Sequence, residues 1–320
     1  MSNSIVPWVE KYRPFSLDQV IGHDNLVARL KSYVQTRNLP NLLFSGPAGC
    51  GKTTCALAIS RDLFGDDYQS SFFELNASDD RGIDTVRGKI KDFARSMPVN
   101  NVPFKILLLD EADALTADAQ QALRRTMEKY SSNTRFILSC NYSSRIIEPI
   151  QSRCALMRFS SLTPEDFKKL FNSIAEKEGL SIEPDAFDAL LYVAEGDGRK
   201  AVNCLQSCAS FSTKITADAI YSVSARARPK EINELLQLAL AGKFIEARKT
   251  LDKLLFEYGI SGEDVVLQLF HEVNRAEMDD KLRLKIIERI GECDYRLNEG
   301  ANDRIQIETL LASFALLNSS

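Results

Sequence analysis

The sequence has very little histidine, and its cysteines are not arranged as metal ligands. His23 and His271 are the only two histidines and stand far apart, so catalysis or metal binding by a histidine cluster is not expected. The seven cysteines form no C-x-x-C pair, which removes the usual signature of structural zinc. Cys140, Cys204 and Cys208 lie in apolar periodic segments, as reduced core thiols in a reducing compartment would.

Long apolar segments and a strong excess of one charge are also missing. No segment is long and apolar enough to span a bilayer, so no membrane association is expected. The first residues lack the basic-then-apolar layout of a signal peptide, which favours a cytoplasmic location. The net charge of −4 argues against a uniformly basic nucleic-acid-binding protein but leaves room for a local basic surface.

The first half of the chain alternates strand-like and helix-like segments. This alternation predicts an α/β fold with a mostly parallel sheet covered by helices on both faces. Strands are predicted at 41–45, 72–75, 106–110, 135–140 and 155–159. Helices are expected between them, for example over 115–130 with Thr116 as N-cap.

From residue 160 onward only helices are predicted. Thr163, Pro164 and Asp166 form a capping-box start, Gly196 interrupts a later helix, and Thr216 offers another N-cap. We interpret 226–231 as a linker because Pro229 stops what precedes it. Three or four amphipathic helices are predicted beyond it, broken where Gly259 ends one helix and Ser261, with Asp264, starts the next. The predicted domains are therefore 1–159, 160–226 and 229–320.

A phosphate-binding loop follows the first predicted strand. The segment "FSGPAGCGKTT" has the G-x-x-x-x-G-K-[ST] spacing between a strand and a helix, the context that this motif requires. Backbone N–H groups of such a loop surround phosphate oxygens, Lys52 reaches the β- and γ-phosphates, and the Thr53 hydroxyl binds Mg²⁺. The predicted nucleotide-binding residues here are Gly46, Pro47, Ala48, Gly49, Cys50, Gly51, Lys52, Thr53 and Thr54.

Two further strand ends carry polar residues suited to ATP hydrolysis. In "ILLLDEAD" a buried strand ends at Asp110, a candidate Mg²⁺ ligand, and Glu111, which could orient or deprotonate the attacking water. Asn141 ends another buried strand and could hold that water or the γ-phosphate. Taken alone, Asn141 could also cap the following turn. Together with the loop, these residues favour ATP hydrolysis.

These elements resemble the AAA+ ATPases, and longer segments narrow the resemblance. The segments "PWVEKYRP", "LNASDDRGID", "DEADALTADAQQALRRTME", "RFILSCNYSSRIIEPIQSRC" and "AEGDGRKAVNCLQ" are similar to boxes of the replication factor C small subunit, most of all its archaeal form. The resemblance covers nearly all of the chain. It implies an AAA+ domain, a helical lid and an all-α collar.

The resemblance also assigns roles to two arginines. Arg153, in "SRC", corresponds to an arginine finger that reaches the γ-phosphate bound by a neighbouring subunit, whereas the motif-free interpretation is a surface ion pair. Arg199 takes the place of a sensor that reaches the phosphates from the lid. The family pattern places Val9, Arg13 and Val20 or Ile21 beside the nucleotide. Trp8 and Tyr12 are expected only to pack the amino-terminal arm.

A basic helical stripe is the candidate DNA-binding surface. Arg87, Lys91 and Arg95 repeat on one face of the predicted helix at 83–95, opposite the apolar stripe of Ile83, Val86, Ile90 and Phe93. As a bare pattern this is a surface helix with a solvated basic face. The resemblance instead implies phosphate contacts to primer–template DNA, from Arg81, Arg87 and Lys91, with Arg124 and Arg125 as second choices. The end near Phe93 could dock the clamp.

The implied partners are the other replication factor C subunits (further small subunits and a large subunit), a sliding clamp and primer–template DNA. The implied cofactors are ATP and Mg²⁺. The resemblance implies a nucleoid-associated protein in a prokaryote or a nuclear one in a eukaryote. Two other classes stay open: an AAA+ remodeller or helicase that forms a hexameric ring, and an ATP-binding structural subunit without useful hydrolysis. The collar argues against the first, and the full set of catalytic residues against the second.

Overall fold

The computed structural model of the chain describes residues 6–79, 82, 84, 86–98, 102–224 and 226–317. It divides into two compact units. The first consists of Met1–Ile182 with Leu190–Lys214, and the second of Glu183–Ala189 with Ile215–Ser320. Each unit has its own hydrophobic core. The three predicted domain boundaries stay a prediction.

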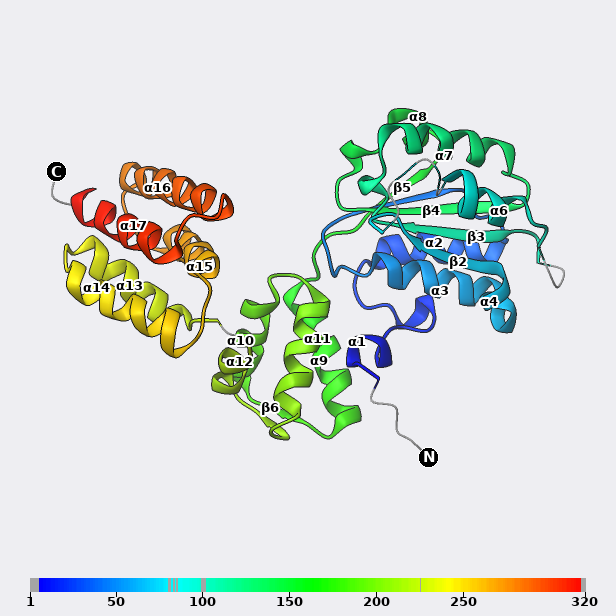
Figure 1. Cartoon of the computed structure of the whole chain (residues 1–320). Coiled ribbons are helices and arrows are strands. Elements are labelled where there is room, and N and C mark those ends of the chain that lie inside the picture. Colours follow the sequence, from blue (N-terminus) through cyan, green and yellow to red (C-terminus); the bar gives the residue numbers. More distant parts are fainter. Residues whose placement is uncertain are drawn as a thin grey trace. The chain divides into compact units, whose positions relative to one another are not determined.

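A five-stranded parallel sheet forms the centre of the first unit (Figure 1). Its strand order is β2-β3-β4-β1-β5. In register, Ser45 pairs with Cys140, and Asn76 with Asp110. The five strands are β1 (Leu42–Ser45), β2 (Phe72–Asn76), β3 (Lys105–Asp110), β4 (Thr134–Cys140) and β5 (Ala155–Arg158). All five predicted strands are confirmed to within one residue at each end.

Helices cover both faces of this sheet (Figure 1). Because side chains alternate along a strand, Leu42 and Phe44 pack against one helical layer and Leu43 against the other. The first layer is formed by α2 (Asp24–Thr36) and α3 (Lys52–Phe64). The second is formed by α6 (Lys91–Arg95), α7 (Ala117–Lys129) and α8 (Glu148–Gln151). This is the predicted α/β fold.

Predicted helix starts are confirmed where a side chain caps the backbone. The Thr116 hydroxyl accepts a hydrogen bond from Ala119 N at the start of α7. Thr163 and Asp166 form the reciprocal capping box of α9 (Pro164–Glu178). Gly196, with φ of 84°, separates α10 (Pro184–Ala194) from α11 (Gly198–Ala209). Thr216 Oγ1 accepts from Ala219 N at 3.3 Å and starts α12 (Ala217–Ser224).

Three details of the second half differ from the predictions. Two short strands occur after residue 160, where only helices were predicted: β6 (Ser181–Ile182) pairs with β7 (Lys214–Ile215). Pro229 starts α13 (Pro229–Leu240) instead of lying in a linker, since proline suits the first turn of a helix. Between residues 226 and 317 the structure has five α-helices where three or four were predicted: α13, α14 (Phe244–Asp252), α15 (Gly262–Arg275), α16 (Asp280–Asn298) and α17 (Asp303–Leu317). The break before α15 is confirmed, with Gly259 at φ 67° and Ser261 capping Asp264 N.

The remaining described elements are short. They are the α-helices α1 (Trp8–Lys11) and α4 (Tyr68–Ser71), the 3₁₀-helices η1 (Leu17–Gln19), η2 (Gly65–Asp67), η4 (Ala112–Ala114) and η5 (Ser143–Arg145), and the π-helices η3 (Val86–Ile90) and η6 (Lys253–Glu257).

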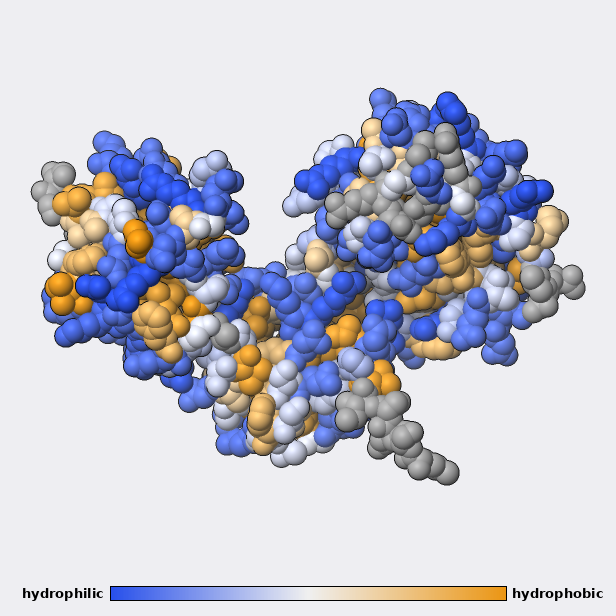
Figure 2. Space-filling model, viewed as in Figure 1, coloured by the Kyte–Doolittle hydropathy of each residue, from blue (hydrophilic) through white to orange (hydrophobic). Residues whose placement is uncertain are grey.

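The helices α13 to α17 pack around an apolar core that includes Leu236, Leu251, Leu269 and Phe314. The surface of the described chain is mainly hydrophilic, with smaller hydrophobic areas over these helices (Figure 2). Exposed apolar side chains in this unit are Ile245, Phe256, Tyr258, Leu267, Leu284, Tyr295, Ile305 and Leu316. Within the described ranges, no helix combines the length and apolarity needed to cross a membrane.

Candidate nucleotide-binding site

The loop between β1 and α3 has the backbone of a phosphate cradle. Gly49 and Gly51 adopt φ of 67° and 97°, which side chains other than glycine rarely allow. A Cβ on Gly46 would lie 2.2 Å from the Phe159 carbonyl oxygen, so glycine is required there by close packing. The Cys50 side chain is buried, and its thiol donates a hydrogen bond to Pro47 O at 3.0 Å within the loop.

The loop lysine and threonine face residues from two other strands. Lys52 Nζ donates to the carbonyl oxygens of Gly46 and Pro47, both at 2.7 Å, and to Asn141 Oδ1 at 3.1 Å. Thr53 Oγ1 donates to Asp110 Oδ2 at 2.5 Å. Hydroxyl and carboxylate oxygens this close are the hard ligands that Mg²⁺ prefers, so the pair fits a metal ion bound with phosphates.

Glu111 follows Asp110 in a left-handed backbone conformation with φ of 51°. Its N–H donates to Asp110 Oδ1 at 2.9 Å. A non-glycine residue in this conformation is uncommon and is concentrated at functional sites. Lys52, Thr53, Asp110, Glu111 and Asn141 line one pocket. The three strand ends that the sequence singled out therefore meet.

A second acidic residue holds the loop after β4. Asp113 Oδ2 accepts the backbone N–H groups of Asn141 and Tyr142, each at 3.2 Å. It thus links the loop after β3 to the loop that carries Asn141. Asp113 was not among the residues predicted from the sequence. The sequence feature that could have indicated Asp113 is its place as the last residue of "DEAD", a carboxylate three residues after the predicted strand ends.

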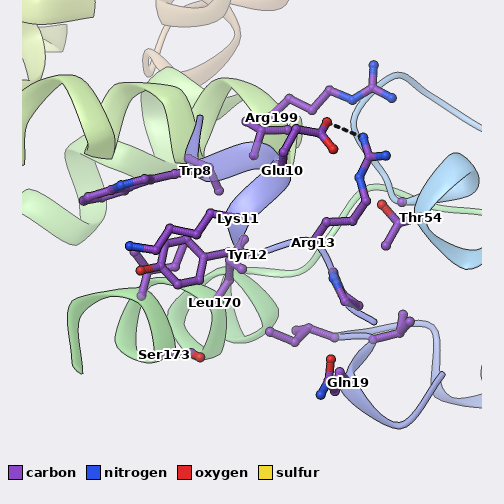
Figure 3. A pocket seen from close by; sticks show the side chains of 18 of the residues that line it. Trp8, Glu10, Lys11, Tyr12, Arg13, Gln19, Thr54, Leu170, Ser173 and Arg199 are labelled. Atoms are coloured by element: carbon purple, nitrogen blue, oxygen red, sulfur yellow. Dashed lines mark hydrogen bonds and ion pairs between the residues drawn. The ribbon is translucent and has the colours of Figure 1, made fainter. Parts of the chain in front are cut away.

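A cavity of about 770 Å³ adjoins the phosphate loop (Figure 3). Val9 and Arg13 line it together with Thr54, and so do both Val20 and Ile21, between which the resemblance left the choice open. The Arg13 guanidinium is paired with Glu10 at 2.6 Å (Figure 3). The cavity is large enough for a nucleoside.

Trp8 and Tyr12 attach the amino-terminal arm to α9 and α11. Trp8 N donates to Gln206 Oε1 at 2.8 Å, and the Tyr12 hydroxyl donates to Glu178. Lys11 Nζ lies 2.6 Å from the same carboxylate. Hydrogen bonds from Lys11 and then Tyr12 hold the pKa of Glu178 below its usual range. Packing of the arm is therefore the role that the contacts of Trp8 and Tyr12 support.

The start of α11 lies directly on the phosphate loop. Gly198 N donates to Gly49 O at 3.2 Å, and a Cβ on Gly49 would lie 1.8 Å from Asp197 Oδ1. Asp197 caps α11 by accepting from Arg199 N at 2.8 Å. Arg199 lines both the large cavity and the phosphate pocket, and its role as a sensor stays a prediction. Lys200 instead lies 3.6 Å from Glu195.

His23 and Asp197 are further contacts of the loop that the sequence analysis missed. His23 Nε2 lies 3.0 Å from Cys50 O, and its ring packs on Phe159 with centroids 5.1 Å apart. The only local signal for His23 was its place directly after "DQVIG". Asp197 could have been found as the N-cap in "GDGR".

Arg153 lies outside this site. It follows α8, and among the described residues it lines neither the cavity nor the phosphate pocket. Its guanidinium forms an ion pair with Glu128 at 2.6 Å, and the Arg153 side chain is 38% exposed. The alternative of a surface ion pair is therefore present in the structure, but an exposed pair leaves the guanidinium accessible to a neighbouring molecule.

The structure describes the candidate DNA-binding segment only in part. Arg81 lies outside the described residues, and of Arg87 only the backbone is described. Within 86–95, the described part of the predicted helix is a π-helical turn, η3, followed directly by α6. Ile90 at the end of η3 and Ala94 in α6 are buried, and Lys91 is exposed. Lys105 attaches this segment to β3 by donating to Phe93 O and, at 2.6 Å, to Ser96 Oγ.

Family models match most of the chain. Residues 42–162 match the ATPase family associated with various cellular activities (AAA), and residues 227–313 match the replication factor C C-terminal domain. Among solved structures, RuvB of Thermotoga maritima has the same fold, with a TM-score of 0.56, 18% identity, and coverage of 80% of this chain and 91% of that chain.

Similar full-length proteins narrow the assignment. The replication factor C small subunit of Archaeoglobus fulgidus is 57% identical over 97% of both chains. That of Methanococcus vannielii is 54% identical over 97% of this chain and 99% of its own, and that of Methanocella arvoryzae is 55% identical over 97% and 96%. The chain therefore belongs to the replication factor C small subunit family, the AAA+ ATPases of clamp loaders in DNA replication.

Proposed function

We propose that the chain binds ATP with Mg²⁺ in this site and hydrolyses it inside a clamp-loader complex that opens a sliding clamp and loads it onto primer–template DNA. The observation that carries the proposal is the meeting of Lys52, Thr53, Asp110, Glu111 and Asn141 in one pocket, while Arg153 stays outside it. A site complete except for its arginine finger is suited to hydrolysis only when a neighbour supplies that finger.

Lys52 and the loop amides bind the phosphates. Lys52 Nζ exchanges the carbonyl oxygens of Gly46 and Pro47 for β- and γ-phosphate oxygens, which carry more negative charge. Thr53 and Asp110 would hold Mg²⁺, and the bound ion would neutralise charge on the phosphates. The backbone amides from Gly49 to Thr53, at the N-terminus of α3, add the helix dipole.

Glu111 and Asn141 act on the attacking water. Glu111 accepts a proton from it or orients it toward the γ-phosphorus, and Asn141 fixes its position from the neighbouring strand. Because Asp113 holds the Asn141 backbone and Lys52 contacts its side chain, the amide is oriented from two sides. Orientation of this kind contributes to catalysis by placing the reactants correctly in advance.

Arg199 and the amino-terminal arm report the presence of nucleotide. Arg199 reaches the phosphates from α11, while Val9, Arg13, Val20 and Ile21 contact the base and ribose. The helices α9 and α11 belong to the proposed lid domain, 160–226. Binding of ATP would therefore draw phosphate loop, arm and lid helices together.

The proposed partners follow from the family and from exposed surfaces. Exposed apolar residues on α14 to α17 support 229–320 as a collar that binds other small subunits and a large subunit. Arg81, Arg87 and Lys91 are the proposed phosphate contacts to DNA, with Arg124 and Arg125 as second choices, and Phe93 lies near the proposed clamp contact. Several subunits with a few such contacts each would give strongly salt-dependent DNA binding.

A mixing experiment tests the finger in trans. A Lys52→Ala chain cannot bind ATP but keeps Arg153, and an Arg153→Ala chain binds ATP but lacks the finger. Either variant alone should lower hydrolysis in the assembled complex by about 10³-fold or more, whereas mixed complexes should regain part of it. Phosphate release measures the rates, and Arg29→Ala, an exposed arginine on α2, is the matched control.

Failure of the mixed complexes to regain hydrolysis, with assembly verified by native mass, would rule out a finger in trans. ATP affinity of the isolated Arg153→Ala chain should equal that of the unaltered chain, because the guanidinium does not line its own site.

A further inference from the structure

Glu128 connects the last turn of α7 to Arg153. Its Oε1 lies 2.6 Å from Nη2 of Arg153 and 3.2 Å from Nη1 of Arg124, which is one helical turn earlier. The Glu128 side chain is 41% exposed and that of Arg153 38%. A carboxylate on the helix that follows the Asp110–Glu111 loop is thus in contact with the proposed finger.

The other edge of the Arg153 guanidinium is held by its own segment. Nη1 donates to Pro149 O at 2.7 Å and to Ser152 Oγ at 3.4 Å. The group is therefore fixed by α7 on one side and by the α8 turn on the other. Because a guanidinium is planar, contacts to both terminal nitrogens set the orientation of its plane as well as its position.

We propose that Glu128 is a positioning residue for Arg153: its carboxylate orients the guanidinium toward the γ-phosphate of ATP bound by a neighbouring subunit. This inference rests on the proposed role of Arg153 as a finger in trans. Without Glu128, the long arginine side chain would sample more rotamers, and ordering it in the transition state would cost conformational entropy.

Glu128 does not hold the finger back. An ion pair this exposed is weak, since water screens both charges. The γ-phosphate of ATP carries more charge, and a guanidinium binds phosphate oxygens in a bidentate manner. Glu128 contacts only Nη2 of Arg153, so the guanidinium can bind phosphate oxygens while it keeps this contact, and the carboxylate sets its orientation.

The test measures ATP hydrolysis by the assembled complex with clamp and primed DNA. Glu128→Ala should lower kcat about five-fold, equivalent to ~1 kcal/mol of activation free energy, with KM changed less than about two-fold. Glu128→Gln should restore most of the rate, because its amide oxygen can accept the same hydrogen bond. The matched control is Glu176→Ala, an exposed helical glutamate on α9, which should be unaffected.

A double-mutant cycle separates positioning from general destabilisation. In an Arg153→Ala background, adding Glu128→Ala should change nothing further, since there is no finger left to orient. A further five-fold loss in that background would overturn the inference, as would full activity of Glu128→Ala when Arg153→Ala is inactive. If Arg153→Ala itself hydrolyses ATP normally, the finger in trans is wrong and the role of Glu128 falls with it.

Discussion

At the scale of single residues, the site depends on groups that hold catalytic side chains as well as on those side chains. Asp113 accepts two backbone N–H groups of the loop that carries Asn141, each at 3.2 Å. Asp197 likewise accepts a backbone N–H group at the start of α11, whereas His23 Nε2 faces the carbonyl oxygen of Cys50 in the phosphate loop. These contacts restrain the geometry in which hydrolysis occurs.

Removing the Asp113 carboxylate should impair hydrolysis more than binding. Asp113→Ala leaves the N–H groups of Asn141 and Tyr142 without their acceptor, so we expect kcat to fall by about ten-fold while ATP affinity changes little. Asp113→Asn keeps an acceptor oxygen and should recover most of the rate. Steady-state kinetics and fluorescent-nucleotide titration measure the two quantities; equal rates for Asp113→Ala and the unaltered chain would contradict the assignment.

Burial also controls the chemistry of the thiols. Burial raises the pKa of Cys154, next to Arg153, to about 12, and that of Cys55 to about 12. A free thiol titrates near 8.5, so at pH 9 these groups are largely thiolate in the unfolded chain and protonated in the folded one. Folding stability should therefore decrease as pH rises from about 8.5 towards 12.

At pH 9, alkylation of Cys154 and Cys55 should consequently require unfolding of the chain. Peptide mass spectrometry after iodoacetamide treatment should show slow modification of both residues, accelerated by urea near the unfolding midpoint. A rate for Cys154 in the folded chain equal to that of glutathione would show that its thiol is not protected.

At the scale of elements, caps and close contacts decide where helices begin and what they touch. The capping box of α9 pairs Thr163 with Asp166, and a Cβ on Gly22 would lie 3.0 Å from Asp166 Oδ2. The start of α9 thus packs on the segment that carries Val20 and Ile21. The capped start of α9 therefore contacts the segment that lines the proposed base-binding cavity.

Thr163→Val should destabilise the chain by about 1 kcal/mol, because it keeps the shape of threonine but removes the oxygen that accepts the Asp166 N–H. Thr163→Ser, which keeps the hydroxyl, is the control and should be close to neutral. Urea unfolding followed by circular dichroism gives both values. Equal stability of the two variants would mean that the cap contributes nothing measurable.

At the scale of the whole molecule, the proposed function requires assembly. The chain supplies an arginine that does not line its own site and a helical unit with exposed apolar side chains. Both features are suited to contacts with other chains. The RuvB-like fold alone does not distinguish a loader from a branch-migration motor, whereas the match of 227–313 to the replication factor C C-terminal domain does.

Native mass spectrometry should therefore give an open pentamer with a larger partner chain, and not a hexamer. ATP turnover should be low for the isolated chain and should rise when the assembled complex receives both clamp and primed DNA. Equal turnover of the complex with and without these ligands would contradict clamp-loader coupling.

The sequence alone determined the elements whose signals are local. Alternating apolar strands, glycines at positive φ and hydroxyl caps act within a few residues, so β1 to β5, the phosphate loop and the starts of α7 and α9 were predictable. The order β2-β3-β4-β1-β5 was not predicted. In this order β4 lies between β3 and β1, so the ends of the three strands lie together and Asp113 can accept the N–H group of Asn141.

The tertiary structure decided contacts between segments far apart in the chain. The ion pair of Arg153 with Glu128, the contact of His23 with Cys50 and the packing of Asp197 on Gly49 each join residues that no pattern connects. The π-helical turn before α6 and the fifth carboxyl-terminal helix also departed from the predictions, because packing against a core overrides weak local preference. Such contacts depend on distances in the folded chain, which periodicity does not encode.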